Sequence, residues 1–376
     1  VIAERRVFEM KVSQKSQTKK VFFVIPEMVS GGPDRVFFQL IDGLDRSVYI
    51  PSLVVSRAGG RYFDAIPDDV EKHILNGGRY PIWLLARLID RLKPDIVITT
   101  LRMNLTAMLA RPIQKHKSVL ITRQANAIET NFAELKKKSL IKHRFAEWLT
   151  KVSLRNSDVF IAQSTDMADE LKKYVSHHQK ITVIGNPIDV EETKSKIFHE
   201  KLKQDSPKVG CPAFISVGRL TQQKGYDLLI TAFATLLQNQ PDARLTIVGE
   251  GAERNYLEQL ITRLGLVDKV YLVGQKENVL PLVESSDIFV SSSRYEGFSN
   301  AILEAMALGK LVVATNCEGG TRDMIVDGET GVLAKNPSVS ELFEALSRGS
   351  VADWLAMGMA GQKHIEMKFS KKKIIA

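Results

Sequence analysis

The chain is poor in cysteine, with only Cys211 and Cys317 among 376 residues. The two lie far apart and form no Cys-x-x-Cys pattern, which argues against a disulfide framework and against a zinc site. No stretch approaches the roughly 18 to 20 uninterrupted apolar residues that a membrane-spanning helix needs. Residues 1–20 are charged rather than apolar, so no secretory signal peptide is expected. Together these absences favour a globular protein of the reducing cytoplasm.

Short motifs of phosphate and metal chemistry are missing as well. No Walker loop occurs, and the paired glycines of Gly31-Gly32-Pro33-Asp34-Arg35 do not form a Gly-x-Gly-x-x-Gly fingerprint. Both facts count against an NTPase or a dinucleotide enzyme. There is also no Asp-x-Asp pair to hold a metal against a diphosphate, so cations and helix amides would have to supply the counter-charge. We therefore predict an activity without metal or cofactor.

Charge is distributed unevenly along the chain. Residues 1–190 contain 30 Lys and Arg against 20 Asp and Glu, a net charge of +10, whereas residues 191–376 contain 22 against 23, a net charge of −1. A basic first half suits an anionic partner such as acidic lipid, a phosphorylated acceptor or nucleic acid. The alternative is a solvated surface that happens to be basic. No nucleic-acid recognition motif accompanies the charge, so a nucleic-acid partner is not expected.

From Val21 onward, apolar runs of strand length alternate with helical patterns, which is typical of parallel sheets. The expected strands are 21–26, 50–56, 95–100, 118–123, 159–162, 181–184, 213–217, 245–248, 270–273, 288–290, 311–314 and 332–334. The expected helices of the first half are 33–44, 81–92, 104–114, 134–155 and 165–174. We therefore expect an α/β protein with two doubly wound, Rossmann-like parallel-sheet domains that face a cleft.

The domain boundaries follow from breaks in this alternation. Residues 1–20 read as an N-terminal extension, with disorder as one alternative for it. The first domain covers 21–190, and the charge-rich segment 191–210 reads as the linker. The second domain covers 211–350, and helices over 351–376 are expected to pack back toward the first.

Two glutamates, Glu296 and Glu304, mark the most informative stretch. If a helix starts near Ser299, Glu296 stands just before its N-terminus and Glu304 lies on its first turns. The strand before the pair and the turn and strand after it place both acids at the carboxyl edge of a parallel sheet, where ligands bind in doubly wound folds. Helix N-terminal amides suit a phosphate, and carboxylates suit the hydroxyls of a ribose or hexose. The spacing alone is common in helical proteins, but this setting predicts a nucleotide-sugar site.

Glycines and cations follow the strands at the same edge. Gly218 and Arg219 come directly after the first strand of the second half, with Lys224 five positions on, where cations could neutralise a diphosphate. Gly249 opens another tight turn, and Gly32 precedes a helix of the first half. Surface cations and ordinary tight turns are the alternatives for these features.

The expected helix 134–155 is amphipathic. Its apolar positions are Ile141, Phe145, Trp148, Leu149 and Val152, and its cations are Lys136, Lys137, Lys138, Lys142, Arg144 and Lys151. A basic amphipathic helix can rest on an anionic bilayer surface. The same stripe can instead pack on its own sheet, and this alternative is favoured.

Several motifs occur together in the second half. They are Gly218-Arg219-Leu220 with Lys224-Gly225, Val248-Gly249-Glu250-Gly251, the run from Glu296 to Gly309, Gly319-Gly320, and Asp327-Gly328-Glu329-Thr330-Gly331-Val332-Leu333. In this order and spacing the chain resembles the retaining glycosyltransferases of family 4, which have the GT-B fold. The resemblance is strong over residues 211–340 and looser before them, where Gly31-Gly32 and 185–189 are recognisable.

The resemblance implies transfer of a hexose or N-acetylhexosamine from a nucleotide sugar, with UDP favoured over GDP, to a glycan or lipid-linked acceptor. It further implies retention of anomeric configuration without a metal, in the synthesis of bacterial capsule, O-antigen or lipopolysaccharide. The enzyme would act in the cytoplasm, with the inner face of the cell membrane as a possible site of peripheral attachment. A catalytically silent GT-B subunit is the runner-up, and a basic nucleic-acid-binding protein is a weaker third.

The resemblance also assigns residues. Arg219 and Lys224 would contact the donor diphosphate, Glu296 the hydroxyls of the donor sugar, and Glu304 the ribose. The implied catalytic set is Glu296, Arg219 and Lys224; the donor-binding set is Gly32, Gly218, Gly249, Gly297, Phe298, Ser299, Asn300 and Glu304; the acceptor-side candidates are Arg35 and Arg123. The chain departs from the family in the stretch 121–126, which lacks the histidine that many members carry near the donor sugar. Arg123 is the candidate to replace it.

Overall fold

The computed structural model describes residues 18–29, 31–125, 140–176, 179–197 and 212–376. The chain divides into two compact units, and each is described by itself. The first unit holds the described residues up to Ala162 together with Glu170–Thr182; the second holds Gln163–Asp169 and Val183–Ile374. Most of the expected N-terminal extension and of the expected linker lies outside the described residues. The second unit thus takes in a short segment from within the sequence of the first.

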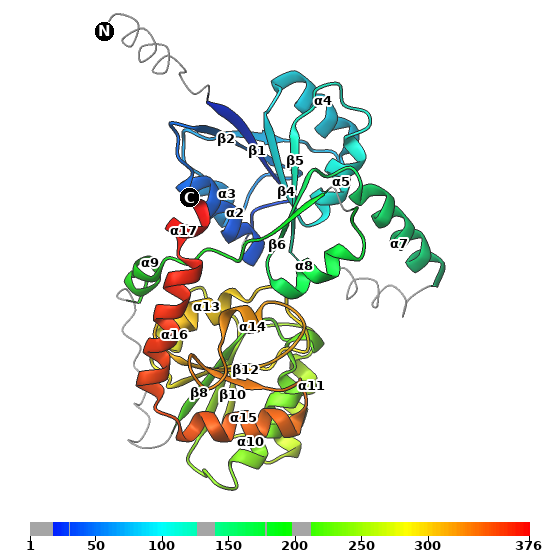
Figure 1. Ribbon diagram of the computed structural model, residues 1–376. Helices are drawn as coiled ribbons and strands as arrows, with labels where there is room; N and C mark the ends of the chain where they lie inside the picture. Colours follow the sequence, from blue (N-terminus) through cyan, green and yellow to red (C-terminus); the bar gives the residue numbers. More distant parts are fainter. Residues whose placement is uncertain (1–17, 30, 126–139, 177–178, 198–211) are drawn as a thin grey trace, which may run out of the picture. The chain divides into compact units, whose positions relative to one another are not determined.

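The first unit is built on a parallel sheet with the strand order β3-β2-β1-β4-β5-β6-β7 (Figure 1). Its strands are β1 (Lys19–Ile25), β2 (Tyr49–Val55), β3 (Glu71–Ile74), β4 (Ile96–Thr100), β5 (Val119–Gln124), β6 (Val159–Ala162) and β7 (Lys180–Val183). Its helices are α2 (Gly32–Gly43), α3 (Arg61–Asp64), α4 (Ile82–Leu92), α5 (Arg102–Ala110) and α7 (Leu140–Leu154), and α8 (Thr165–Lys172) spans the boundary with the second unit. The described neighbouring strands from β3 to β6 pair in parallel, which confirms the expected α/β sheet.

The core of the first unit explains which of its strands could be predicted from the sequence. β1 is apolar and buried along most of its length, and Phe23 contacts Phe37 of α2 edge to face with ring centroids 5.7 Å apart. Strands covered on both faces show such continuous apolar runs. β3 lacks this signal because it is a short edge strand, Glu71–Ile74, with no buried residue. It was therefore absent from the expected strands.

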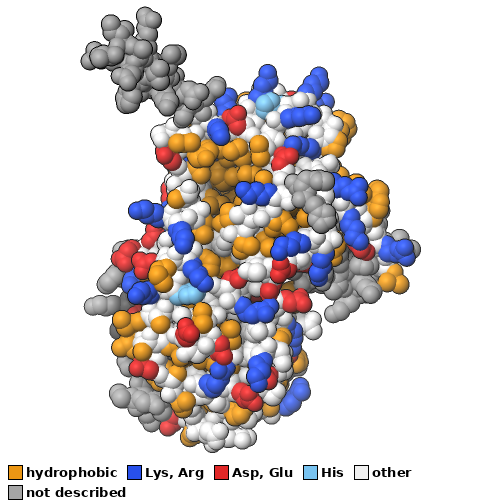
Figure 2. All heavy atoms as spheres, viewed as in Figure 1, with side chains coloured by type: hydrophobic (Ala, Val, Ile, Leu, Met, Phe, Trp, Pro, Cys, Tyr) orange, Lys and Arg blue, Asp and Glu red, His pale blue; other side chains and the backbone are white. Residues whose placement is uncertain are grey.

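One face of this sheet is only partly covered across β4 and β5. On one side of the sheet the side chains of Val97, Leu120 and Phe160 are buried. On the opposite side, Ile98 and Ile121 lie next to each other in the sheet and are half-buried. Figure 2 shows hydrophobic side chains gathered on the visible face of this unit. Apolar side chains therefore contribute to the surface of the first unit as well as to its core.

Helix α7 is the described part of the expected amphipathic helix. Residues 134–139 lie outside the described residues, and the helix is described from Leu140 to Leu154. Trp148 and Val152, one turn apart, are 58% and 41% exposed. Part of the apolar stripe is thus turned to solvent. In the part of the chain that the structure describes, no helix is both long and apolar enough to cross a membrane.

The second unit is a six-stranded parallel sheet with the order β10-β9-β8-β11-β12-β13 (Figure 1). Its strands are β8 (Ala213–Val217), β9 (Arg244–Val248), β10 (Val270–Leu272), β11 (Ile288–Ser291), β12 (Leu311–Thr315) and β13 (Val332–Ala334). Its helices are α9 (Val190–Ser195), η1 (Gln222–Lys224), α10 (Tyr226–Leu236), α11 (Arg254–Arg263), α12 (Leu280–Glu284), α13 (Asn300–Ala307), α14 (Thr321–Met324), α15 (Val339–Val351), α16 (Trp354–Phe369) and α17 (Lys371–Ile375). All six strands expected in this half are confirmed.

Two hydrophobic clusters cover the two faces of the second sheet. Phe214 of β8 belongs to a cluster with Phe233 of α10, and the rings meet edge to face at 5.5 Å. The next residue, Ile215, points to the other face and joins a cluster that contains Ile302 of α13 and Ile365 of α16. Successive residues of a strand alternate between faces, so a fully apolar strand feeds both clusters. The strand β8 is thereby fixed in the middle of the unit.

The strand order of the second unit reverses between β8 and β11. These neighbours pair in parallel through Ile288 with Phe214 and Phe289 with Ile215, yet β9 and β10 lie between them in sequence. The loops that leave the carboxyl ends of β8 and β11 diverge to opposite sides of the sheet. Ligands of doubly wound folds bind at such a switch point. The search for a site therefore begins with the loops after Val217 and Ser291.

Candidate active site at the switch point of the second unit

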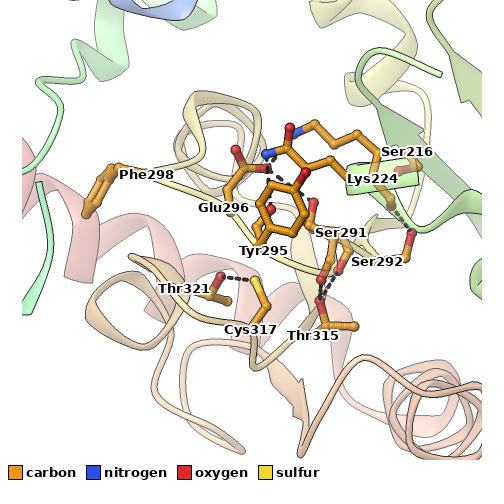
Figure 3. A network of polar contacts seen from close by, with 12 residues as sticks. Ser216, Lys224, Ser291, Ser292, Tyr295, Glu296, Phe298, Thr315, Cys317 and Thr321 are labelled. Atoms are coloured by element: carbon orange, nitrogen blue, oxygen red, sulfur yellow. Dashed lines mark hydrogen bonds and ion pairs between the residues drawn. The ribbon is translucent and has the colours of Figure 1, made fainter. Parts of the chain in front are cut away.

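The loops after β8 and β11 bring Lys224 and Glu296 together. Lys224 ends the short helix η1, Glu296 lies between β11 and α13, and the ammonium donates a hydrogen bond to Glu296 Oε2. The two side chains are only 18% and 15% exposed. Figure 3 shows them pointing toward one another, with Phe298 standing apart. The sequence placed both residues at one sheet edge but did not pair them.

The carboxylate of Glu296 keeps one oxygen for another partner. Ser293 Oγ donates to Oε2 at 3.2 Å, the same oxygen that Lys224 engages. Among the described residues no hydrogen bond to Oε1 is found. A carboxylate held in this way can accept a hydrogen bond from a ligand hydroxyl without losing its cation. This arrangement fits the expected role of Glu296 on a sugar.

Arg219 differs from Lys224 in its surroundings. It is exposed, and no hydrogen bond or ion pair of its side chain is found within the described part of the chain. Its backbone is held, because the amide of the next residue, Leu220, donates to Glu250 O at 2.9 Å. An arginine on a fixed backbone with an unengaged guanidinium suits a phosphate ligand.

Glycine is required where the loops after β8 and β9 meet. A Cβ on Gly249, whose φ is +150°, would lie 1.9 Å from Gly218 O. A Cβ on Gly218 would lie 2.9 Å from Tyr226 Oη and 3.2 Å from Lys224 Cε. Burial raises the pKa of Tyr226, so its phenol stays protonated beside Lys224. Gly249 therefore allows the close approach of the Gly218 backbone, and Gly218 leaves room for the side chains of Tyr226 and Lys224. Donor binding by these two glycines stays a prediction.

A third loop, after β12, fixes the backbone of Glu296. The amide of Glu296 donates to Glu318 O at 3.1 Å, and the amide of Gly320 donates to Gly297 O at 2.7 Å. Gly319 has a φ of +127°, and a Cβ there would lie 1.8 Å from Glu296 O. The carboxylate therefore sits on a loop that is clamped against its neighbour.

Helix α8 holds that third loop from its outer side. Asp166 accepts a hydrogen bond from the amide of Gly319 at 3.2 Å and pairs with Arg322 at 2.9 Å. In return, Asp323 accepts hydrogen bonds from the amide and hydroxyl of Thr165, both at 2.8 Å. All of these residues belong to the second unit. The segment 163–169 is thus part of the support of the site.

Helix α13 begins where the sequence predicted, with Ser299 as N-cap and Asn300 as first residue. The Ser299 side chain forms no capping bond, and within the described chain the amides of Phe298 and Ser299 donate to no backbone carbonyl. Unsatisfied amides and the positive end of the helix dipole favour an anion. Glu304 lies one turn on and is half-buried.

Phe298 contributes its backbone rather than its ring to this end of the helix. The side chain is 5% exposed and meets Phe369 edge to face, with centroids 5.2 Å apart and planes at 68°. A Cβ on Gly320 would come within 2.3 Å of the Phe298 ring. The ring anchors the loop in the core, which leaves the amide as the group that can meet a ligand.

Sequence reasoning missed Arg294 as a member of the site. Its guanidinium binds both oxygens of Asp227, at 2.8 and 2.6 Å, and also donates to Gln222 O at 2.8 Å. Burial would raise the pKa of Asp227, but the hydrogen bonds and charge of Arg294 outweigh it and hold that pKa below its usual range. Arg294 thus ties the loop after β11 to η1 through Gln222 and to α10 through Asp227. No local pattern signals the pair of Arg294 and Asp227, because its members are far apart in sequence.

Asn186 is the second residue that was missed. It is 3% exposed, and its Nδ2 donates to Phe298 O at 3.1 Å and to Asn300 Oδ1 at 2.7 Å. The segment 185–189 carried only a family resemblance in the sequence. The structure places Asn186 directly under the start of α13.

The remaining candidates belong to the first unit. Gly32 opens α2 next to Gly31, whose amide donates to Asp34 Oδ2 at 2.9 Å. Arg35 follows in the first turn and is half-buried. Arg123 lies near the end of β5, and burial lowers the pKa of its guanidinium to about 10, so it is still a cation at neutral pH. The roles of Gly32, Arg35 and Arg123 toward donor and acceptor stay predictions.

The described residues contain no group of three or more His, Cys, Asp and Glu side chains that could hold a metal ion. The counter-charges that the described site does offer to a phosphate are Arg219, Lys224 and the amides before α13. Independence from metals stays a prediction, which an assay with chelator would decide.

Two family models match the chain. The model of glycosyl transferases group 1 matches residues 198–349, and that of Glycosyltransferase Family 4 matches residues 30–192. The first match contains the switch-point site and the second contains most of the first sheet. Together they cover most of the chain.

Several curated proteins are similar to it. An uncharacterized glycosyltransferase of Methanocaldococcus jannaschii is 29% identical over 64% of this chain and 60% of its own length. The N-acetylgalactosamine-N,N'-diacetylbacillosaminyl-diphospho-undecaprenol 4-alpha-N-acetylgalactosaminyltransferase of Campylobacter jejuni is 28% identical over 73% of this chain and 72% of its own length. The lipopolysaccharide core biosynthesis glycosyltransferase LpsE of Rhizobium meliloti is 32% identical over 50% of this chain and 53% of its own length. The chain thus spans less than two thirds of two of these three relatives.

Solved structures share the fold. HepE of Anabaena in complex with UDP has a TM-score of 0.76 at 20% identity, over 95% of this chain and 97% of that one. The apo form of the lipopolysaccharide outer core galactosyltransferase WaaB has a TM-score of 0.72 at 19% identity, over 94% and 97%. At these identities the likeness establishes the fold, and it confirms the GT-B class expected from the sequence.

Proposed function

Because the chain is a family 4-like glycosyltransferase with the GT-B fold, we propose that it moves a hexose or N-acetylhexosamine from a nucleotide sugar to a glycan or lipid-linked acceptor. The observation that carries the proposal is the Lys224–Glu296 pair at the switch point, next to the open amides before α13. Cation, carboxylate and amides are the groups that a sugar diphosphate requires. Transfer proceeds with retention of configuration and without a metal.

Each side chain has a role in this proposal. Arg219 and Lys224 neutralise the diphosphate, and the amides of Phe298 and Ser299 bind its oxygens. Lys224 has three N–H donors, so it can keep its bond to Glu296 while it engages a phosphate. Glu296 then holds hydroxyls of the donor sugar through Oε1, and Glu304 holds the ribose.

The proposed reaction needs no protein base. The bond between the anomeric carbon and the phosphate oxygen breaks, and its electron pair leaves with the diphosphate. The acceptor oxygen attacks the same face of the sugar, and its proton passes to the departing phosphate oxygen. The cations and amides of the site stabilise the charge that develops on the diphosphate, which lowers the barrier to its departure.

The proposed donor base is uracil, and the proposed pathway is the assembly of a bacterial surface glycan. HepE was solved with UDP, and relatives are named for transfer to a diphospho-undecaprenol-linked sugar and for lipopolysaccharide core biosynthesis. Acceptors of this kind are lipid-linked, so the proposed place of action is the cytoplasmic face of the cell membrane. These names support the proposal by likeness.

A thermal-shift panel of UDP-, GDP- and ADP-sugars tests the donor. A ligand that binds only the native state raises the midpoint of unfolding, so the UDP-sugar should give the largest shift. Glu296→Ala, Arg219→Ala and Lys224→Ala should then each lower sugar transfer by about 100-fold or more, since each removes a transition-state contact. No shift with any nucleotide sugar would refute the proposal, whereas shifts without transfer would indicate a catalytically silent subunit.

A further inference from the structure

We propose that Asn186 is a positioning residue that aims the amide of Ser299 at the donor diphosphate. This inference rests on the proposed function, because it assigns a cause to the geometry of the phosphate-binding amides. Asn186 lies outside the loops after β8 and β11, in the segment that follows β7. Its side chain is nevertheless directed at the start of α13, where it donates to Phe298 and Asn300.

The two hydrogen bonds of Asn186 fix the direction of one peptide plane. Its Nδ2 donates to Phe298 O at 3.1 Å. A trans peptide is planar, and its C=O and N–H groups point in opposite directions. When Phe298 O points at Asn186, the N–H of Ser299 in the same plane must point away from it. Asn186 thereby determines where that amide is aimed.

The second bond holds the first residue of the helix. Nδ2 also donates to Asn300 Oδ1 at 2.7 Å. Ser299 lies between the two anchored residues and is 5% exposed. The residues on both sides of Ser299 are therefore held by a single buried amide group, and the backbone N–H of Ser299 faces the opposite side.

The segment that carries Asn186 is itself immobilised in the second unit. Ile188 donates to Phe369 O and accepts from the amide of Lys371, both at 2.8 Å. A Cβ on Gly185 would lie 2.9 Å from both Phe298 Cζ and the ring of Phe369. The two bonds of Ile188 and the close packing at Gly185 hold this backbone, so the Asn186 side chain is presented at one defined position. A hydrogen-bond donor on a fixed backbone can orient the loop that it contacts, whereas a donor on a mobile backbone would move with that loop.

The experiment compares nucleoside diphosphates with uridine on Asn186→Ala, Asn186→Asp and the unmodified chain by calorimetric titration. Aspartate has the shape of asparagine, so it keeps the packing but has no N–H to donate. UDP affinity should fall about tenfold in both variants, since a hydrogen bond that orients a binding group is lost. Uridine affinity should stay unchanged, because the ribose and base do not meet the Ser299 amide. If the unmodified chain also binds GDP or ADP, the affinity of the variants for these nucleotides should fall by the same factor as their affinity for UDP.

Asn278→Ala is the matched control. Asn278 likewise donates from Nδ2 to a backbone carbonyl, Lys196 O at 3.0 Å, and it belongs to the loop after β10 rather than to the loops after β8 and β11. Loss of the Asn278 hydrogen bond should leave UDP affinity unaltered. Unchanged UDP binding in Asn186→Asp, or equal losses for uridine and UDP, would overturn the inference. If the unmodified chain bound no nucleoside diphosphate at all, the proposed function would fall instead.

Discussion

The ammonium of Lys224 and the carboxylate of Glu296 stabilise each other in a setting that is mostly closed to water. Lys224→Met would leave a partly buried carboxylate without its cation, at a cost of about 2 kcal/mol in the free energy of unfolding. Adding Glu296→Gln removes that stranded charge, so the double variant should regain part of the loss while staying inactive. Urea unfolding and transfer assays measure both quantities. A double variant less stable than Lys224→Met alone would contradict this account.

Asp227 and Arg294 give the site a defined response to acid. The pKa of Asp227 lies below its ordinary 3.8 in the folded chain, so the ionised carboxylate stabilises the fold at pH values above that figure. This contribution is lost as the pH falls through the lowered value. Relative to Asp227→Asn, the extra stability of the unmodified chain should be constant near neutral pH and shrink below pH 3.8. Urea unfolding across that pH range measures the difference in stability between the two proteins. A difference that grew as the pH fell would contradict the pairing of Asp227 with Arg294.

At the scale of single residues, the sequence predicted where the candidate residues lie better than what they contact. Glu296, Arg219 and Lys224 could be named because each follows a recognisable strand or opens a helix. The contact between Lys224 and Glu296 depends on β8 lying beside β11, and strand order is not visible in a local pattern. Asn186 and Arg294 were missed for the same reason. Their partners are 112 and 67 residues away.

Among the structural elements, the loops after β11 and β12 behave as one support for Glu296. Gly319→Ala should place a Cβ 1.8 Å from Glu296 O, and its φ of +127° disfavours any side chain. We expect a loss of several kcal/mol and of most activity, since the backbone under the carboxylate must move. Thermal unfolding and transfer assays measure the effects.

Gly328→Ala is the control for that substitution. Gly328 also has a positive φ, of +78°, but a Cβ there would meet nothing within 4 Å. It should cost only about 1 kcal/mol of backbone strain and leave transfer intact. Equal effects of the two substitutions would mean that conformation alone, and not the close approach to Glu296, requires glycine at 319.

Whole elements were the easiest part of the fold to predict. Buried parallel strands such as β1 and β8 are continuous apolar runs, so their positions followed from composition. The start of α13 followed from Ser299 and the small residues around it. β3 could not be predicted, because an exposed edge strand needs few apolar residues and owes its conformation to pairing with β2.

For the molecule as a whole, the basic first half motivates a test of attachment to anionic lipid. Helix α7 exposes Trp148 and Val152 beside Lys151 and Arg155. Co-sedimentation with vesicles should rise with the anionic fraction and fall with salt. Lys151→Glu with Arg155→Glu should weaken it about tenfold or more, given about 1 kcal/mol per cation near the surface and the added repulsion. Arg263→Glu, a substitution of an exposed residue of the second unit, is the control. Equal co-sedimentation with neutral and anionic vesicles would contradict an electrostatic contribution to membrane binding.

The interleaving of the two units limits how this protein can be divided. The chain enters the second unit at 163–169, leaves it, and returns at Val183. A gene fragment that begins at residue 191, a natural choice from sequence alone, would omit Asp166 with its bond to Gly319 and Asn186 with its bonds at α13. No single cut therefore yields a complete donor-side fragment. Insertions, fusion junctions and crossovers between relatives that fall within residues 163–190 should therefore damage the second unit.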